Sequence, residues 1–361
     1  MTGGLGSGTY KPDEVSFLLK PITLEPVERS EKERLIQSGA KHYSEMISVE
    51  SPPDDAYMSI YAEALRRNAV RLAQHINALA DALASRSTDA RGLALASLAR
   101  AGTPIGVLLT LALRARGIRV AHYSISIIRG RGLDLHALQY ILARHDRTDI
   151  VFIDGWTGKG AIADELRRPD GALSLGVSPY LVVVADPAGQ ADLAATGDDY
   201  VIPSGILNGV VSGLISRSIL NEQIQGRDFH GCVVLESLRP LDVSQAFIDA
   251  IAVELPRAEP LPENEWTPQL AFERRRDCKK LLKTLMETFD ITDVNRIKPG
   301  IAEATRAVLR RVPERLLISD VGDPEVRHLL YLAADRHVPI EPIPCRSAYK
   351  AVAIIGSVGS D

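Results

Sequence analysis

The chain is poor in cysteine, with only three in 361 residues, and these stand far apart at Cys232, Cys278 and Cys345. No two of them form a C-x-x-C pair, so the sequence excludes a zinc site of that type and a disulfide framework. Isolated, unpaired thiols are typical of proteins that work in a reducing compartment. We therefore expect a cytoplasmic protein.

A strong charge of either sign and a long apolar run are also missing. The net charge is only −4, which excludes a chain-wide electrostatic attraction to nucleic acid, so any contact with polyanions has to be local. The uncharged stretch 200–216 is interrupted by Pro203, Ser204 and Asn208 and is short for a bilayer span. Residues 1–14 carry no apolar core of a secretory signal. No membrane partner is expected.

Residues 1–90 are expected to form a disordered, glycine-rich start followed by a helical extension. Within 57–84, apolar residues recur three, four or seven positions apart, which places them on one face of a helix. This set consists of Tyr61, Leu65, Leu72, Ile76, Leu79 and Leu83. The pattern predicts a scaffold helix that packs on the main domain.

Residues 91–260 show apolar runs that alternate with helical segments. The runs that predict strands are 118–128, 150–153 and 180–185, and the segments that predict helices are 103–115, 133–145 and 159–168. Strands that alternate with helices are typical of a parallel sheet covered on both faces. The predicted fold class is therefore α/β.

Residues 261–361 are predicted to form a second unit, with a domain boundary near residue 260. A stretch rich in Pro and Glu, 240–268, is typical of a linker, and 269–290 predicts a basic helix. Strands are predicted at 315–318 and 351–355, and helices at 300–311 and 324–336. The pattern indicates a small C-terminal α/β domain.

The motif "VFIDGWTGKGAI" at 151–162 follows the predicted strand 150–153. Asp154 then lies at the carboxyl end of the strand, where ligands bind in open α/β sheets. Thr157, Gly158, Lys159 and Gly160 lead into a helix, and such a turn can hold a phosphate with backbone N–H groups. Asp154 would accept hydrogen bonds from sugar hydroxyls or hold a hydrated Mg²⁺. A glycine-rich turn that serves only the fold is the alternative.

Two further loops have features of an anion site. Arg100, Gly102 and Thr103 precede an apolar helix that begins near Pro104, and Gly102 permits close approach of the backbone. "SIIRGRGLD" at 126–134 carries Arg129 and Arg131. Two turns suited to anions on one sheet would match a ligand with two phosphate groups. Taken by itself, the sequence of 126–134 is also typical of an ordinary solvated surface loop.

This set of loops resembles the type I phosphoribosyltransferases. In that family a Thr-Gly turn after an acidic strand end holds the 5′-phosphate of phosphoribosyl pyrophosphate, and an earlier loop holds the pyrophosphate. The resemblance implies a 5′-phosphate site at Thr157, Gly158, Lys159 and Gly160, and a pyrophosphate site at Arg100, Gly102 and Thr103. Asp154 would contact the ribose, and this sequence departs from the family at Gly155, where a second acidic residue is usual.

Further segments resemble one bacterial family more specifically. These are "ADPAG" at 185–189, "DDYVIPSGILNGVVSGLISRSIL" at 198–220, "NRIKPGIAEATRAVLRR" at 295–311 and "YKAVAII" at 349–355. The family is the phosphoribosyltransferase-like protein associated with tellurium-resistance and stress operons, which carries a C-terminal Pelota-type RNA-binding domain. It is also labelled a cysteine protease of the StiP type. The resemblance implies a phosphoribosyltransferase-like parallel sheet domain at 91–260, and a linker helix with a Pelota-like domain at 261–361.

Ser204, Asn208, Ser212 and Ser216 recur every four residues, as do the glycines from Gly205 to Gly213. On a helix the glycines would form a groove for close packing. Alternatively, this segment lines an acceptor pocket together with the end of the strand at 180–185. The acceptor-pocket residues would be Asp186, Pro187, Ser204 and Asn208.

Basic residues in the C-terminal unit suggest phosphate contacts with RNA. The candidates are Arg296, Lys298, Arg306 and Arg310. Interspersed acidic residues also fit a solvated face, while the family resemblance implies RNA binding. "RRRDCKK" at 274–280 is a second basic patch.

A cysteine protease requires a thiolate beside a histidine. Cys232 follows His230 in "DFHGCVV", and side chains two apart on a strand share a face. The apolar sequence after Cys232 also fits a buried structural cysteine. Cys278 lies in a basic helix with no histidine nearby in sequence. Cys232 is therefore the alternative nucleophile.

The main hypothesis is a phosphoribosyltransferase that uses phosphoribosyl pyrophosphate and Mg²⁺, with Asp154 as the metal ligand. Positioning and charge stabilisation would carry the reaction, with Asp154, Arg129 and Arg131 as catalytic residues. The acceptor is not identified by the sequence. The alternatives are the StiP-type cysteine protease and a nucleotide- and RNA-binding sensor without turnover. The oligomeric state stays open, with a homodimer among the expected forms.

Overall fold

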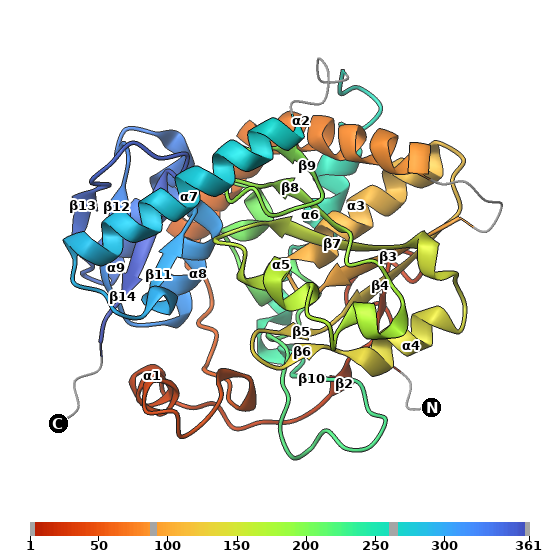
Figure 1. The fold of residues 1–361 in the computed structure, drawn as a ribbon, viewed down its shortest axis with the longest axis horizontal. Helices are drawn as coiled ribbons and strands as arrows, with labels where there is room; N and C mark the ends of the chain where they lie inside the picture. The colour runs from red at the N-terminus through yellow and green to blue at the C-terminus, as the bar shows by residue number, and fades with distance from the viewer. Residues whose placement is uncertain (1–3, 87–91, 260–265, 358–361) are drawn as a thin grey trace.

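All six strands of the main sheet run parallel in the computed structural model, which describes residues 4–86, 92–259 and 266–357 (Figure 1). Their spatial order is β1-β4-β3-β7-β8-β9. The strands are β1 (Ser16–Phe17), β3 (Leu93–Leu98), β4 (Val120–Ile125), β7 (Ile150–Trp156), β8 (Leu181–Ala185) and β9 (Leu193–Thr196). The predicted parallel α/β sheet is confirmed.

Helices cover both faces of this sheet, which explains why its central strands are apolar along their whole length. One face is covered by α2 (Asp55–Arg86), α3 (Gly102–Ala115) and α6 (Ser244–Ala252). The other face is covered by α4 (Leu135–Leu142) and α5 (Ala161–Leu166). Side chains of β3 alternate between the two cores, with Leu95 on the first face and Ala96 on the second.

Short elements connect the strands and helices of the two regions. Helix α1 (Arg29–Gln37) precedes α2, β2 (Lys20–Pro21) pairs in parallel with β10 (Gly231–Cys232), and β5 (Ile127–Ile128) forms a hairpin with β6 (Gly132–Leu133). The 3₁₀ helices η1 to η8 are Tyr43–Glu45, Arg147–Asp149, Ala172–Leu175, Pro203–Gly205, Gly209–Val211, Glu236–Leu241, Val294–Arg296 and Pro324–Val326.

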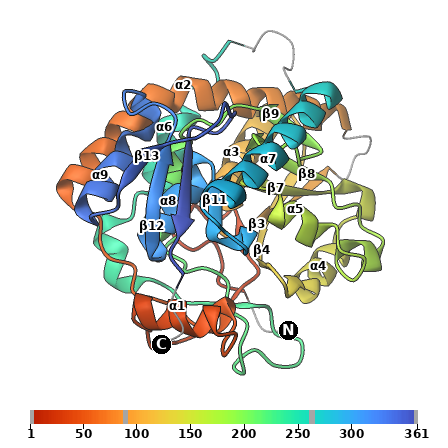
Figure 2. The ribbon, with the colours of Figure 1, turned by 60° about the vertical axis from the view of Figure 1, so that its left-hand side comes forward.

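The C-terminal region contains a second sheet of order β11-β14-β12-β13. In chain order its elements are α7 (Pro268–Thr288), β11 (Ile297–Pro299), α8 (Ile301–Arg310), β12 (Pro313–Ile318), α9 (Arg327–Asp335), β13 (Ile340–Pro342) and β14 (Ala351–Ile355). Strand side chains alternate between α8 and α9 on one face and α7 on the other, and Figure 2 shows α9 and α7 on opposite sides of this sheet. A small C-terminal α/β region is therefore present, as predicted.

The two sheets are joined by α7 and α8. Figure 1 shows α7 crossing from the main sheet to the C-terminal sheet. A Cβ atom added at Gly189 would lie 2.1 Å from the carbonyl oxygen of Ala271, so α7 packs directly on the loop after β8. Helix α8 adds Ile301 and Ala304 to the core that also contains α2. The C-terminal region thus covers part of the carboxyl edge of the main sheet.

Three expectations about local structure are wrong. Residues 4–12 are ordered rather than disordered, because Tyr10 is buried and stacks on Phe17. The expected linker 240–268 contains α6, which packs against α2 and α3. The segment 204–216 is not a helix with a glycine groove: it forms short 3₁₀ turns, and Gly213 has a φ of +81°.

Candidate functional site

The order in which the chain adds strands to the main sheet reverses between β3 and β7. Open parallel sheets bind ligands at such a switch point. The segment after β3 carries Arg100 to Thr103, and the end of β7 carries Asp154. The two segments touch, since a Cβ atom added at Gly102 would lie 2.2 Å from the carbonyl oxygen of Ile153. The structure therefore brings these two predicted loops together.

Asp154 lies at this switch point and lines a cavity of about 90 Å³ with Trp156, Lys298 and Arg306. Its carboxylate accepts a hydrogen bond from the Gly155 N–H group at 2.8 Å. Burial raises the pKa of Asp154 to about 7, and the nearby charge of Arg306 opposes that rise. The Asp154 carboxyl can therefore exchange a proton near neutral pH.

Protein groups already occupy the turn after Asp154. The Thr157 hydroxyl donates a hydrogen bond to the buried carboxylate of Asp186, and Lys159 donates to the carbonyl oxygens of Val294 and Ile297. Gly160 has a φ of +93°. The hydrogen bonds of Thr157 and Lys159 satisfy the groups that were expected to hold a phosphate.

The C-terminal region covers this same turn. The Gly158 carbonyl oxygen accepts a hydrogen bond from the Tyr349 hydroxyl at 2.7 Å. A Cβ atom added at Gly158 would lie 2.6 Å from Cγ of Glu303, and the Trp156 ring N–H donates to the Glu303 carboxylate at 3.4 Å. The turn is thus part of the contact between the two sheets.

The other predicted anion-binding residues also have protein partners. Arg100 is buried, donates to the carbonyl oxygen of Ile215 and pairs with Glu50. The hydroxyl groups of Thr103 and Ser124 lie 2.8 Å apart. At this edge of the sheet, an ion pair and hydrogen bonds between protein groups therefore occupy the residues that were expected to bind an anion.

The loop with Arg129 and Arg131 contacts residues of the N-terminal and C-terminal regions. The Arg129 guanidinium donates to the Asn295 side chain at 3.2 Å, and Arg131 pairs with Glu45. Arg129 also lines the small cavity beside Asp154. The structure therefore places Arg129, but not Arg131, on that cavity.

The four predicted acceptor-pocket residues do not share one pocket. Asp186 is fully buried and accepts hydrogen bonds from Thr157 and from the Ala191 N–H group at 2.6 Å. Pro187 lines a small cavity next to Trp156. Ser204 is buried, and its hydroxyl has no hydrogen-bond partner in the described part of the chain. Asn208 instead lines a larger pocket and accepts a hydrogen bond from Arg310.

The predicted RNA-binding residues mostly face the main domain. Lys298 lines the cavity beside Asp154, and Arg306 lies over the Trp156 ring, 4.6 Å from its centre. Arg310 reaches the larger pocket, while Arg296 pairs with Glu314 at 2.9 Å. Burial, together with the positive charges of Lys159, Arg129 and Arg311, lowers the pKa of Lys298 to about 7.

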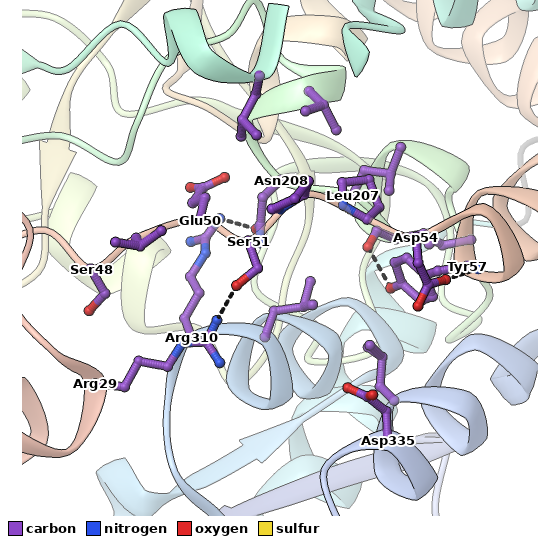
Figure 3. Close-up of a pocket in the computed structure, with 18 of the residues that line it drawn as sticks. Arg29, Ser48, Glu50, Ser51, Asp54, Tyr57, Leu207, Asn208, Arg310 and Asp335 are labelled. Carbon is purple, nitrogen blue, oxygen red and sulfur yellow. Dashed lines mark hydrogen bonds between the residues drawn. The ribbon is translucent and has the colours of Figure 1, made fainter. Parts of the chain in front are cut away.

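The larger pocket has a volume of about 380 Å³ and lies between α1, the start of α2, the 206–210 loop, α8 and α9. Figure 3 shows Arg29 and Arg310 near Ser51 at one end, with Asp54, Tyr57 and Asp335 at the other. Sequence reasoning missed Lys32, Glu50 and Arg217 at this pocket. Lys32 and Glu50 lie in the polar, mixed stretch 28–50, where nothing local marks a site.

Neither Cys232 nor His230 lines any of the cavities described above. Cys232 is fully buried in the main core, and this burial raises the pKa of its thiol to about 12. Nδ1 of the neighbouring His230 lies 2.8 Å from the Ser126 hydroxyl. The Asp134 carboxylate accepts a hydrogen bond from the His230 backbone N–H at 2.6 Å. His230 therefore contacts Ser126 and Asp134, and no hydrogen bond joins the Cys232 thiol to a described residue.

In residues 4–86, 92–259 and 266–357, no group of three or more His, Cys, Asp or Glu side chains is arranged to hold a metal ion, and Mg²⁺ stays a prediction. Among the same residues, no helix is both long and apolar enough to cross a membrane.

The fold defines a two-part α/β protein, in which a parallel-sheet domain is joined to a small α/β module and ionisable groups line a cavity between them. Residues 8–252 match the family described as tellurite-like stress resistance cysteine protease StiP. Residues 277–357 match the PELOTA RNA-binding domain. The cysteine protease StiP of Acinetobacter baylyi is 42% identical over 365 residues, covering 98% of this chain and 95% of that relative. The chain belongs to the StiP family.

These comparisons overturn the main functional hypothesis. Both the family and the relative carry the name of a cysteine protease, so the prediction of a transferase that uses phosphoribosyl pyrophosphate is wrong. The protein partners of Thr157 and Lys159 supply a physical reason, since the expected phosphate-binding groups are engaged in hydrogen bonds. A glycine-rich turn that joins strand to helix produced the same local pattern.

Proposed function

We propose that this protein is a cysteine protease of the StiP type, with Cys232 as its nucleophile. The observation that carries the proposal is the position of that cysteine. The family match spans 8–252, and Cys232 is the only one of the three cysteines in the sequence that falls inside it. Cys278 and Cys345 fall in the part that matches the RNA-binding domain.

The surroundings of Cys232 supply a base and a carboxylate. His230 lies two residues away, and Asp134 accepts a hydrogen bond from the His230 backbone. Burial lowers the pKa of His230, whereas the charge of Asp134 opposes that shift. A thiolate, an imidazole that removes its proton and a carboxylate that stabilises the imidazolium are the components of cysteine-protease chemistry.

The protease reaction demands a change in this part of the molecule. A thiol with a pKa of about 12 carries almost no thiolate at neutral pH. Strand β10, which contains Cys232, pairs with Lys20–Pro21 of β2, and the Ile219–Gly231 bridge closes its other side. In the active form the thiol must leave the apolar core and approach His230. The described conformation is therefore a latent one.

The test compares three single variants, Cys232→Ala, Cys278→Ala and Cys345→Ala, in hydrolysis of a fluorescently labelled unfolded protein. We expect only Cys232→Ala to abolish cleavage, and we expect His230→Gln to reduce it by at least about 100-fold. Thermal melting checks that each variant is folded. Full activity in Cys232→Ala would exclude this nucleophile.

A second function, RNA binding, is favoured by the match of residues 277–357 to the PELOTA domain. We propose that the exposed face of α7 contributes to it, since the predicted residues Lys298, Arg306 and Arg310 face the main domain. This face carries an exposed aromatic ring, Phe272, and several exposed basic side chains. The basic residues are Arg276, Lys279, Lys280 and Lys283. Basic groups with an aromatic ring suit single-stranded RNA.

Fluorescence anisotropy with a labelled single-stranded RNA tests this surface. Replacing Lys279, Lys280 and Lys283 together by Gln should weaken binding and flatten the dependence of log affinity on log salt by about 0.7 for each lost phosphate contact. Arg144→Gln, in the turn after α4, serves as a control that also removes a positive charge. Equal binding by the triple variant and the wild type would exclude α7.

The sheet domain is also proposed to share its fold with the type I phosphoribosyltransferases, without their reaction. Support comes from the all-parallel sheet and from the order of β4, β3, β7, β8 and β9, which is that of doubly wound nucleotide-binding folds. An experimental structure superimposed on members of that class tests the proposal. A different strand order would overturn it.

A further inference from the structure

The larger pocket, here called the cationic pocket, concentrates positive charge at one end. Five basic side chains line it: Arg336, whose Nε lies 4.0 Å from the Asp335 carboxylate, and four others, namely Arg29 and Lys32 from α1, Arg217 from the main domain and Arg310 from α8. Within the described residues, none of the four has a carboxylate within 4.0 Å. Lys32 is only 4% exposed, so water cannot fully compensate its charge.

The partners of these four groups are neutral. The Arg29 guanidinium donates to the Ser51 hydroxyl at 3.1 Å, and Lys32 donates to the Ser48 hydroxyl at 3.1 Å. Arg310 donates to the Asn208 side chain, but its buried Nε has no partner in the described part of the chain. The Arg217 guanidinium lies over the Tyr43 ring, 4.2 Å from its centre.

The one carboxylate at this end is already engaged. Glu50 pairs with Arg100 at the sheet edge and also accepts a hydrogen bond from the Gly209 N–H group at 3.0 Å. Burial, followed by repulsion from Arg217 and Arg310, lowers the pKa of Lys32 to about 7. Buried charges in proteins are normally paired. An arrangement of several unpaired cations around a cavity is therefore suited to an anionic ligand.

The opposite end of the cationic pocket has a different chemistry. Its wall is apolar, formed by Tyr57 and by the side chains of Ile206, Leu207, Leu238, Leu309 and Leu332. Asp54 and Asp335 also reach this end (Figure 3). The Asp54 oxygens accept hydrogen bonds from the Tyr57 N–H group and the Tyr331 hydroxyl, each at 2.8 Å, and a carboxylate oxygen has a second lone pair for a hydroxyl or amino group of a ligand. A volume of about 380 Å³ lies in the range of small-molecule sites.

We propose that the cationic pocket binds a nucleoside phosphate, with the phosphate groups against Lys32, Arg217 and Arg310. The nucleoside lies against Tyr57 and Leu207, and Asp54 and Asp335 accept hydrogen bonds from its sugar or base. This inference is independent of the protease proposal, because it concerns a different pocket and needs no cysteine. Since α1, the main domain and α8 all contribute, the ligand stabilises their contact.

Isothermal titration calorimetry of the full chain tests the proposal with defined probes. ADP, GDP, CDP and UDP present both chemical parts, inorganic pyrophosphate presents only the anion, and adenosine only a nucleoside. We expect at least one diphosphate to bind at least about tenfold more tightly than pyrophosphate or adenosine. Lys32→Met and Arg310→Gln should each weaken that binding by about ten- to hundredfold, because each removes a charge-assisted hydrogen bond.

Two controls separate binding from folding. Arg144→Gln removes an exposed arginine in the turn after α4, which does not line the pocket, and should leave the affinity unchanged. The nucleotide should raise the melting temperature of the wild type, but not that of the Lys32→Met, Arg310→Gln double variant. Lys32→Met is expected to fold, since it replaces a buried cation with an apolar chain of similar length.

The proposal is overturned if none of the four nucleoside diphosphates binds the wild type. It is equally overturned if pyrophosphate or adenosine alone binds as tightly as the diphosphate, because the two-part site would then be wrong. Unchanged affinity in both Lys32→Met and Arg310→Gln would place the nucleotide elsewhere. Binding of an acidic peptide without any nucleotide binding would assign the pocket to a different ligand.

Discussion

The Thr157 hydroxyl donates its hydrogen bond to the carboxylate of Asp186, and this contact joins the carboxyl ends of β7 and β8. The second Asp186 oxygen accepts a hydrogen bond from the Ala191 N–H group at 2.6 Å. Burial raises the pKa of Asp186, so each hydrogen bond matters for keeping the carboxylate in the interior. Thr157, which was expected to bind a phosphate, thus forms a structural hydrogen bond with Asp186.

Removing this hydroxyl should destabilise the protein. Thr157→Val keeps the size of the side chain but leaves a fully buried carboxylate with one donor fewer, so we expect a loss of about 1–3 kcal/mol in the free energy of unfolding. Urea unfolding measures the effect, and Thr157→Ser should retain most of the stability. A Thr157→Val variant as stable as the wild type would show that the hydrogen bond adds nothing.

Glycines at the sheet edge should differ in their tolerance of a methyl group. A Cβ atom at Gly102 would lie 2.2 Å from the carbonyl oxygen of Ile153, whereas the nearest atom to one at Gly155 is 3.5 Å away. Gly102→Ala is therefore expected to cost about 1–3 kcal/mol of stability, and Gly155→Ala less than about 1 kcal/mol. Chemical denaturation of the two variants under the same conditions compares them. Equal losses would contradict this packing.

The three cysteines should react with a thiol reagent at different rates. Cys345 is partly exposed, while Cys232 and Cys278 are buried, and burial raises the pKa of both buried thiols. Because the thiolate is the reactive form, iodoacetamide should label Cys345 first and Cys232 much more slowly. Peptide mass mapping over time gives the order. Fast labelling of Cys232 would mean that the folded protein already populates an exposed form of β10.

Lys32 should lower stability in a pH-dependent way. Its pKa is about 7 in the folded chain, against an ordinary value of 10.5, so the unfolded state binds more protons between these limits. Stability should therefore rise with pH through this window. Lys32→Met should raise the free energy of unfolding by about 2 kcal/mol at pH 6.5, and this gain should shrink toward pH 10.

Urea unfolding of the wild type and Lys32→Met at pH 6.5, 8 and 10 measures this difference. Lys298→Met provides a comparison, since the pKa of Lys298 is also lowered to about 7, by burial and neighbouring cations. Arg144→Gln should show no such trend. A gain that stays constant from pH 6.5 to 10 would contradict the unpaired charge assigned to Lys32.

Much of the architecture follows from local patterns in the sequence. The apolar periodicity of 57–84 predicts a helix, and α2 spans Asp55–Arg86. The predicted strand 150–153 is part of β7, and the strands predicted at 315–318 and 351–355 are present in β12 and β14. These elements form where hydrophobic spacing and local propensity agree.

Other elements could not be predicted because their signal is not local. The "LALASL" segment of β3 is rich in alanine and leucine, which suit a helix as well as a buried strand, and only its place between β4 and β7 selects the strand. The segment 204–216 has a regular glycine spacing but forms turns, since Gly213 packs against Phe17 and accepts a φ of +81°. Tertiary contacts override local preference at both places.

By itself, the sequence determined the α/β class, the division into a large and a small unit, and the residues that follow each strand, because these depend on periodicity and chain order. Only the tertiary structure decided what those residues contact. In the tertiary structure, the Thr157 hydroxyl donates a hydrogen bond to Asp186, and Cys232 is buried. Lys32 of α1 and Arg310 of α8 line the same pocket. Charges and hydrogen-bonding groups act over a few ångströms in space, and separation along the chain does not specify that distance.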